Sequence, residues 1–311
     1  MPMRDVEILD RAKGCLVGLA VGDALGTTLE FTKRDSQPPV ADMVGGGPFR
    51  LKPGQWTDDT SMALCLADSL LHRNSFNPTE MMDRFVDWMR EGYNSSTGEC
   101  FDIGDTTRAA LRNYIDEGIA GDASASPSMA GNGSIMRLAP AVLFSLDDRD
   151  RAIDLSVRQS RPTHAAPEVL EACALMGAVL HAAITGNNPS LPVLREPKIR
   201  KIADGAYLAK VRDDIRSSGY VIDTLEAALW AVSQTDNFRD ALLLAVNLGD
   251  DADTVGAVAG QLAGAKYGYN AIPQEWRNTL AWHDKIAELS VSLVRAGLNR
   301  SRQLTPQPPM A

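Results

Sequence analysis

The sequence predicts an all-α fold, and two observations support this prediction. Apolar residues recur at helical spacing along most of the chain, and no segment alternates with period two as an amphipathic strand would. Several expected helices also carry Gly and Ala at close spacing, most densely in 256–264, so their backbones can approach closely. We therefore expect a compact bundle with tightly packed inner helices.

The expected helices follow one another in a simple order. The first covers 6–20, and the others cover 62–71, 81–89, 109–115, 135–144, 169–184, 224–232, 242–248, 255–267 and 286–298. Glycine-rich turns are expected at 45–48 and 131–133, and a polar, proline-containing surface connection at 186–197. Nothing indicates a second domain, so we expect one domain over 1–300 and a flexible tail over 301–311, which holds three prolines.

Composition narrows the possible partners and the compartment. With 311 residues, 44% of them hydrophobic, the chain can bury a sizeable core. Its 31 basic and 40 acidic residues give 31 − 40 = −9, and no basic stripe appears, so a nucleic-acid partner is not expected. The cysteines are scattered without CxxC spacing, which favours a reducing cytoplasm. We expect no signal peptide, no apolar stretch long enough to span a membrane, and a monomer.

Two acidic clusters, at 57–60 and 249–254, each come directly before an apolar helix. For either cluster alone, helix capping is as good an explanation as metal binding, because helix N-termini favour hydroxyl and carboxylate oxygens. Together they hold five carboxylates, which is more than capping requires. Oxygen ligands without His or Cys favour Mg²⁺, Mn²⁺ or Ca²⁺ over zinc, and two facing helix starts can hold a pair of ions. The predicted metal ligands are Thr57, Asp58, Asp59, Asp251, Asp253 and Thr254.

Other polar residues are candidates for catalysis or ligand binding. Asp23 is expected to make a structural hydrogen bond at the end of the first helix. Glu30, between Leu29 and Phe31, is a carboxylate in an apolar setting and therefore needs a partner or has a raised pKa. The glycine segments 101–108 and 131–134 offer backbone N–H groups to a phosphate, although each is also explained as an ordinary turn. His164 lies on a loop constrained by prolines and is either structural or a ligand contact.

These motifs, taken in order, resemble the ADP-ribosylglycohydrolase family, and most closely its dinitrogenase reductase-activating branch. The matching motifs span about 14–267 and comprise Gly22-Asp-Ala-Leu-Gly26 with Glu30, the 57–60 cluster, Asp102-Ile-Gly104, the 131–137 turn, Thr163-His164 and 249–254. The resemblance implies an orthogonal helical fold with a binuclear Mg²⁺ or Mn²⁺ centre in a cleft. It assigns the six predicted ligands above to that centre.

The resemblance also assigns roles to the remaining motifs. Catalytic roles fall to Glu30, Asp58 and Asp253, with Glu30 or a liganded Asp protonating the leaving guanidine. One departure concerns Asp105, which stands where the activating branch is expected to have Asn, and an acid there repels phosphates. Residues implied to bind the substrate are Glu30, Asp102, Gly104, Asp105, Thr106, Thr107, Gly131, Asn132, Gly133, Ser134 and His164.

The function implied by the resemblance is removal of ADP-ribose from a modified protein side chain, arginine first, by metal-dependent hydrolysis of the N-glycosidic bond. The expected partners are an ADP-ribosylated protein and the product ADP-ribose. Serine-linked and O-acetyl-ADP-ribose remain alternative substrates, and a non-catalytic ADP-ribose-binding protein remains an alternative function. A prenyl-diphosphate synthase, which also binds magnesium through aspartates, would instead use DDxxD within a helix.

Overall fold

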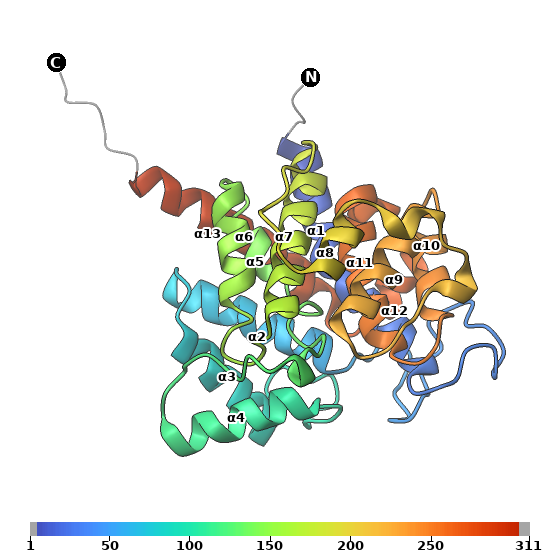
Figure 1. Cartoon of the computed structure of the whole chain (residues 1–311), viewed down its shortest axis with the longest axis horizontal. Coiled ribbons are helices and arrows are strands. Elements are labelled where there is room, and N and C mark those ends of the chain that lie inside the picture. Colours follow the sequence, from blue (N-terminus) through green and yellow to red (C-terminus); the bar gives the residue numbers. More distant parts are fainter. Residues whose placement is uncertain (1–4, 305–311) are drawn as a thin grey trace.

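A computed structural model describes residues 5–304, with side chains up to residue 299. Thirteen α-helices fill this range, and the only β-type pairings within it are isolated bridges, so the all-α prediction is confirmed (Figure 1). The helices are α1 (Asp5–Gly26), α2 (Asp58–Arg73), α3 (Pro78–Glu91), α4 (Asp105–Glu117), α5 (Ala139–Leu143), α6 (Arg149–Arg158), α7 (Pro167–Thr185), α8 (Pro197–Ala203), α9 (Val221–Ser233), α10 (Phe238–Val246), α11 (Ala252–Tyr267), α12 (Gln274–Thr279) and α13 (His283–Leu304).

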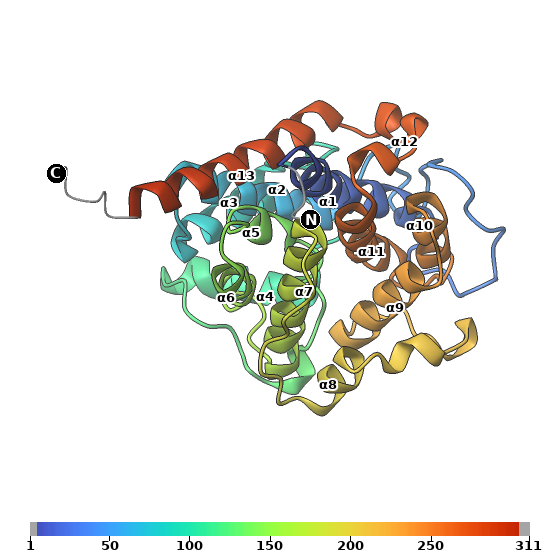
Figure 2. The same ribbon diagram turned by 90° about the horizontal axis from the view of Figure 1, so that it is seen from above.

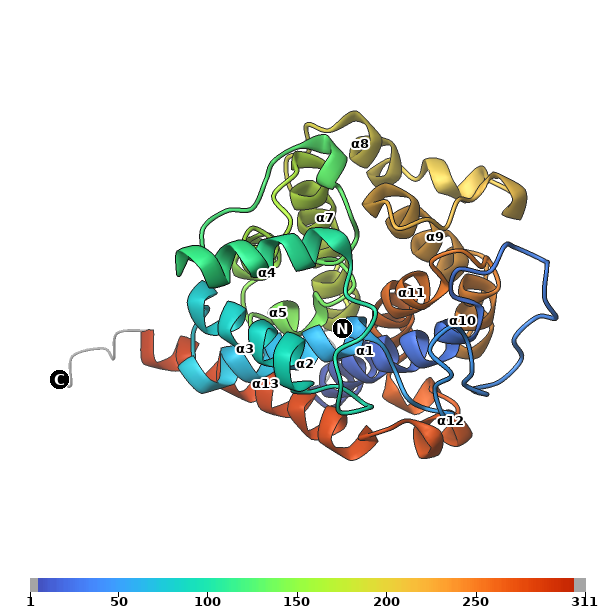
Figure 3. The same cartoon turned by 90° about the horizontal axis from the view of Figure 1, so that it is seen from below.

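The inner helices α1 and α11 form the most extensive helix pair of the described chain. They lie side by side at the centre of the molecule (Figures 2 and 3). A β-carbon on Gly22 of α1 would lie 1.9 Å from the carbonyl oxygen of Gly256 on α11, so only glycine fits there. The expected close approach of helix backbones is therefore confirmed. The facing pairs run in opposite directions along the two helices: Gly14 with Gly264, Gly18 with Gly260, and Gly22 with Gly256.

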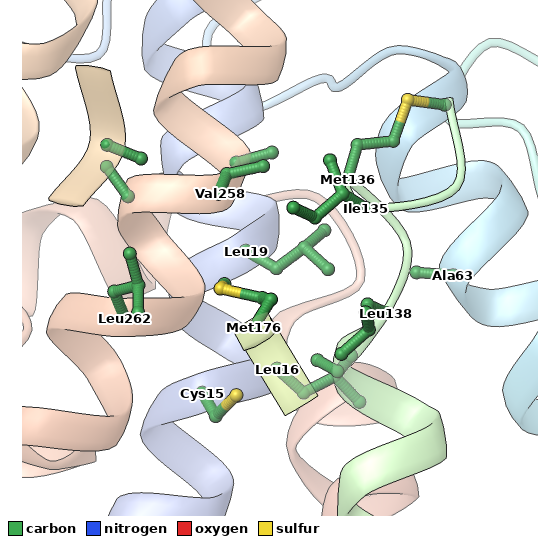
Figure 4. Packing of buried hydrophobic residues seen from close by; sticks show 14 of the residues in the cluster. Cys15, Leu16, Leu19, Ala63, Ile135, Met136, Leu138, Met176, Val258 and Leu262 are labelled. Atoms are coloured by element: carbon green, nitrogen blue, oxygen red, sulfur yellow. The ribbon is translucent and has the colours of Figure 1, made fainter. Parts of the chain in front are cut away.

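These three facing glycine pairs form a glycine seam between α1 and α11, and this seam determines where the acidic motifs lie. Because α1 and α11 are antiparallel, the C-terminal end of α1 contacts the start of α11, and a β-carbon on Gly26 would meet the backbone of Ala252 and Asp253. Leu16 and Leu19 of α1 gather with Met176 of α7 on another face of the same helix (Figure 4), and all three side chains are buried. Each such side chain stabilises the fold by about 1.5–3 kcal/mol, so the site rests on a well-packed scaffold.

One predicted helix is much shorter than expected. Within 135–144 only α5 is helical, and consecutive turns cover 133–137. Pro140 occupies the first turn of α5, and in a longer helix it would lie in the interior, where its ring clashes and it lacks an N–H donor. The sequence also missed the short helices α6, α8 and α12. The start of α6 was marked in the sequence by Asp148, a residue type common at helix N-caps, and in the structure its side chain accepts a hydrogen bond from the backbone N–H of Arg151.

The apolar helix α7 overturns one expectation. An 18-residue window of α7 has a mean hydropathy of 1.5, so one described helix is long and apolar enough to cross a membrane, and the expectation of no such stretch was wrong. However, 67% of that window is buried inside the protein. Packing against α1, α6, α9 and α11 accounts for its apolar character, as in the core helices of other folds.

The connections and the C-terminal end largely agree with what the sequence predicts. Gly45, Gly46 and Gly47 all have positive φ, as expected for a glycine turn, and 186–196 is a mostly exposed, non-helical connection. The helix α13 runs to Leu304, which is four residues into the expected tail. The rest of that tail lies outside the described residues, and the single domain over 1–300 stays a prediction. All four cysteines are free, and three of them are buried.

Candidate metal centre and active site

The two acidic clusters occupy helix starts that their own side chains do not cap. Thr57 is the residue before α2 and Asp251 the residue before α11, yet neither makes a side-chain capping hydrogen bond to its helix. Helix capping therefore does not explain these oxygens. The start of α2 is instead held by Asp23, which comes from the end of α1.

Asp23 is fully buried and accepts four hydrogen bonds. The backbone N–H groups of Thr57 and Thr60 donate to it at 2.9 and 3.0 Å, and their hydroxyls donate at 2.9 and 2.6 Å. The structural role expected for Asp23 is confirmed. A hydroxyl has only one proton, so if Thr57 gives it to Asp23, its lone pairs face the carboxylates of Asp59 and Asp253 at 3.3 and 3.2 Å. Oxygens placed in this way could bind a cation between them.

Five carboxylates converge in two groups that could each hold a metal ion. Glu30, Asp102 and Asp253 form one group, Asp58, Asp59 and Asp253 form the other, and in each group the ligand oxygens lie within 4.8 Å of one another. Asp253 belongs to both. Three oxygens in these groups are buried and have no hydrogen-bond partner, one each from Glu30, Asp59 and Asp253.

The pKa values show that burial, together with neighbouring charges, disfavours the ionised form of these carboxylates. Burial, followed by the charge of Asp102, raises the pKa of Glu30 to about 11. Burial also raises the pKa of Asp102 to about 7, and it raises the pKa values of Asp58, Asp59 and Asp253 well above the usual range, with neighbouring carboxylates as the next cause. These residues cannot all be ionised at neutral pH unless cations neutralise them. The donor set, oxygen only, suits Mg²⁺ or Mn²⁺.

The other two predicted ligands lie beside these groups. The hydroxyl of Thr254 lies 3.4 Å from an Asp59 oxygen. Asp251 accepts a 2.6 Å hydrogen bond from the side-chain amide of Asn132, which ties the 131–133 turn to the start of α11. Asp251 is in neither three-carboxylate group, whereas Asp102, expected only to bind substrate, is in one of them.

A cavity of about 610 Å³ opens over the carboxylates. Of the predicted site residues, Thr57, Asp59 and Ser134 are not in its lining. Thr57 and Asp59 are buried directly behind it, and the hydroxyl of Ser134 contacts Ser160 and Cys173 instead. The structure brings the remaining predicted residues together around the cavity: Glu30, Asp58, Asp102, Gly104, Asp105, Thr106, Thr107, Gly131, Asn132, Gly133, His164, Asp251, Asp253 and Thr254.

Two features of the cavity wall suit a diphosphate. The helix α4 begins after Gly104, which has no side chain to cap it, so the first backbone N–H groups of the helix have no helical acceptor. In the view from below, α4 begins near α1 and α11 and runs outward (Figure 3). On the facing turn, a β-carbon on Gly133 would lie 2.8 Å from the ring of His164 and 3.2 Å from the Thr107 hydroxyl. The missing side chain keeps this wall open.

The imidazole of His164 is held from behind by a buried arginine. Arg137 is fully buried and donates to the hydroxyl of Thr163 at 2.7 Å, and that hydroxyl lies 2.9 Å from Nδ1 of His164. Arg137 also donates to Gln159 twice and faces the ring of Phe85 at 4.6 Å. Burial, with the charge of Arg137 as the second cause, lowers the pKa of His164 to about 3. The imidazole that lines the cavity is therefore neutral.

The sequence missed the outer residues of the cavity. Phe31, Phe49 and Asp250 line it, together with Arg108 and Gly219. The neighbours of two of them were recognised, since Phe31 follows Glu30 and Asp250 precedes Asp251. No pattern singled out Phe49, because it comes from the loop between α1 and α2 and reaches the site only in the folded protein.

Comparisons with known proteins agree with this geometry. ADP-ribosylarginine hydrolase Tri1 of Serratia proteamaculans is 51% identical over 296 residues, which cover 92% of this chain and 80% of that protein. The ADP-ribosyl-[dinitrogen reductase] glycohydrolase of Rhodospirillum rubrum is 37% identical over 282 residues, covering 89% of this chain and 92% of that protein. A solved structure described as an ADP-ribosylglycohydrolase-related protein complex superposes with a TM-score of 0.81 at 41% identity, covering 94% of this chain and 99% of that one.

The alternative of a prenyl-diphosphate synthase is excluded by these likenesses. The resemblance to the activating branch is confirmed, and of the two relatives Tri1 is the more similar to this chain. The family model for ADP-ribosylglycohydrolase matches residues 4–303, nearly the full length of the chain. This protein belongs to the ADP-ribosylglycohydrolase family.

Proposed function

We propose that this protein is a metal-dependent hydrolase that removes ADP-ribose from modified arginine side chains of proteins. The observation that supports it best is the pair of three-carboxylate groups sharing Asp253, in which three buried oxygens have no partner. Two Mg²⁺ or Mn²⁺ ions are the cofactors that fit this arrangement. The residues that would hold them are Asp58, Asp59 and Asp253 for one ion and Asp102 and Asp253, with Glu30 at the edge, for the other, and Thr57, Asp251 and Thr254 lie beside these groups.

When bound, such ions polarise oxygen atoms and lower the pKa of water. The protein's own groups position the substrate. The free N–H groups at the start of α4 and the open turn at Gly133 suit the diphosphate, and the neutral ring of His164 offers a hydrogen bond without adding charge. Asp105 at this helix start repels phosphate and therefore weakens phosphate binding in this part of the site.

Glu30 is the residue best placed to move a proton. It is 3% exposed, lies in the cavity wall, and one of its oxygens has no partner. In the hydrolysis that we propose, water adds to the anomeric carbon, the bond from that carbon to the guanidine nitrogen breaks, and Glu30 protonates that nitrogen. The proton released by the water then returns to the carboxylate, so Glu30 ends as it began.

The arginine linkage is supported by the relative at 51% identity, which is named for hydrolysis of ADP-ribosylarginine. Serine-linked or O-acetyl-ADP-ribose are the alternative substrates, and ADP-ribose binding without catalysis is the alternative function. The four free cysteines agree with a reducing cytoplasm, which we propose as its location.

The test compares Asp58→Asn and Asp253→Asn with the wild type and with Asp116→Asn, an exposed aspartate of α4 remote from the cavity lining. We expect both site variants to lose Mg²⁺ binding by calorimetry and to lose release of ADP-ribose from an arginine-modified protein, while Asp116→Asn keeps both. A panel of arginine-, serine- and acetyl-linked substrates identifies the linkage. Full activity after chelation of metal would refute the mechanism, and ADP-ribose binding without release from any substrate would favour the binding protein.

A further inference from the structure

An aromatic rim borders the acidic end of the cavity, and the residues assigned above to catalysis do not explain it. Phe31, Phe49 and Phe101 form this rim, with ring centroids 6.5 Å apart for the first pair and 5.0 Å for the second. Phe31 and Phe49 line the cavity itself. Two of the three are chain neighbours of metal-site carboxylates, since Phe31 follows Glu30 and Phe101 precedes Asp102.

Phe31 is exposed in a way that core packing does not account for. Its side chain is 69% exposed, and its backbone has a φ of 56°, a left-handed conformation that is uncommon for a bulky residue. Two backbone hydrogen bonds maintain this conformation, from Phe31 N–H to the Asp250 carbonyl at 2.7 Å and from Asp250 N–H to the Thr32 carbonyl at 2.8 Å. The fold therefore holds an apolar ring at the cavity mouth.

Asp250 adds a charge to the same rim. It is exposed, lines the cavity, and its carboxylate makes no hydrogen bond or ion pair with the described residues. Seven acidic side chains line the cavity, against one arginine, Arg108. An aromatic face next to a free carboxylate, in an acidic cavity, is complementary to a flat cation.

We propose that Phe31, Phe49 and Asp250 form the subsite for the guanidinium group of the modified arginine. This inference rests on the proposed function and deepens it, because it names the part of the site that recognises the linkage. A guanidinium stays charged at neutral pH and stacks on aromatic rings while its N–H groups bind a carboxylate. A serine or acetyl linkage offers no such cation.

The position of the rim argues against the adenine base as its occupant. The rim adjoins Glu30 and Asp102, where the bond to be broken would lie. The diphosphate features are the free N–H groups at the start of α4 and the open turn at Gly133, which faces His164 and Thr107 rather than the rim, and the adenosine end of ADP-ribose is attached to the far side of the diphosphate. The guanidinium, attached to the other end of the ligand, is therefore the group that reaches the rim.

The experiment measures two properties in the same variants, namely kcat/KM on an ADP-ribosylarginine peptide and Kd for free ADP-ribose in Mg²⁺. Phe31→Leu and Phe49→Leu keep an apolar side chain but remove the ring, Phe31→Trp keeps the ring, and Asp250→Asn removes the charge at an exposed position that does not threaten folding. We expect the leucine variants and Asp250→Asn each to lower kcat/KM roughly threefold to tenfold, with Phe31→Trp near the wild type and Kd unchanged within about twofold in all four.

Two results would overturn the proposal. A parallel loss of ADP-ribose affinity would assign the rim to the nucleotide, and unchanged kcat/KM in the leucine variants and Asp250→Asn would show that the rim does not contact the substrate. The proposed function fails separately, if the wild type releases no ADP-ribose from arginine. In that case, the Kd of an ADP-ribosylarginine peptide compared with that of ADP-ribose still tests the rim, because only the peptide should bind less tightly to the variants.

Discussion

Replacing Gly22 by Ala is expected to destabilise the fold and to weaken metal binding through one contact. The new β-carbon would lie 1.9 Å from the carbonyl oxygen of Gly256, whereas real β-carbons essentially never come within 3.0 Å of a neighbour. The two helices must therefore separate locally by at least 3.0 − 1.9 = 1.1 Å. Because the atom met is backbone rather than a flexible side chain, the clash cannot be relieved by a change of rotamer.

The size of the effect follows from two opposing contributions. Overpacking costs about 1–3 kcal/mol, and a backbone clash belongs at the upper end of that range. The higher helix propensity of alanine relative to glycine stabilises the folded state by about 1 kcal/mol. The free energy of unfolding should therefore fall by about 2 kcal/mol. The same shift moves Asp23, which positions Thr57, relative to Asp253, and displacements near 1 Å in a site of this kind lower Mg²⁺ affinity roughly tenfold or more.

The assay is urea unfolding of the metal-free protein, followed by Mg²⁺ titration calorimetry of the folded variant. Gly121→Ala is the matched control, because a β-carbon there would meet only the Ile119 side chain at 3.9 Å. A wild-type free energy of unfolding in Gly22→Ala would contradict the tight contact. Reduced stability with unchanged Mg²⁺ affinity would contradict the claim that this seam sets the separation of the ligands.

Three further predictions concern the cavity. Burial raises the pKa of Asp102 from its usual 3.8 to about 7, so the folded metal-free protein retains protons that the unfolded chain has lost. Its stability should therefore fall as pH rises from about 4 to above 7, and Mg²⁺ should restore stability at pH 8. Thermal unfolding at several pH values measures this dependence. A melting temperature that does not change with pH in the metal-free protein would contradict the prediction. Gly133→Ala should push the ring of His164 aside and weaken ADP-ribose binding roughly tenfold in calorimetry, with unfolding unchanged. Thr163→Val leaves one N–H group of buried Arg137 without its acceptor and should lower the free energy of unfolding by about 1–3 kcal/mol in urea, with Thr163→Ser close to the wild type.

Some of the site was readable from local sequence because its chemistry is local. Asp58 and Asp59 come directly before an apolar helix, and so does Asp253 with Asp251, so their type and spacing indicated hard-metal ligands. The helices α1 and α11 were likewise predicted from periodicity, and the glycines in 256–264 indicated the close packing of helix backbones that the fold contains.

Other features depend on contacts between distant segments. The proline that shortens α5 was visible, but its effect was outweighed in the prediction by the apolar period of 135–144. Phe49 and Phe101 carry no motif, and they meet only because loops before α2 and α4 lie together at the cavity mouth. The place of Asp102 in a carboxylate group also depends on the fold, since its partners Glu30 and Asp253 are far away in sequence.

The sequence by itself determined most of the longer helices, the residues chemically suited to hold metal and phosphate, and the family that the chain resembles, because each of these is expressed in neighbouring residues. Only the tertiary structure decided which of those residues meet. Convergence depends on the antiparallel packing of α1 on α11, where glycine lets two backbones touch and places carboxylates from both ends of the chain within reach of the same cation.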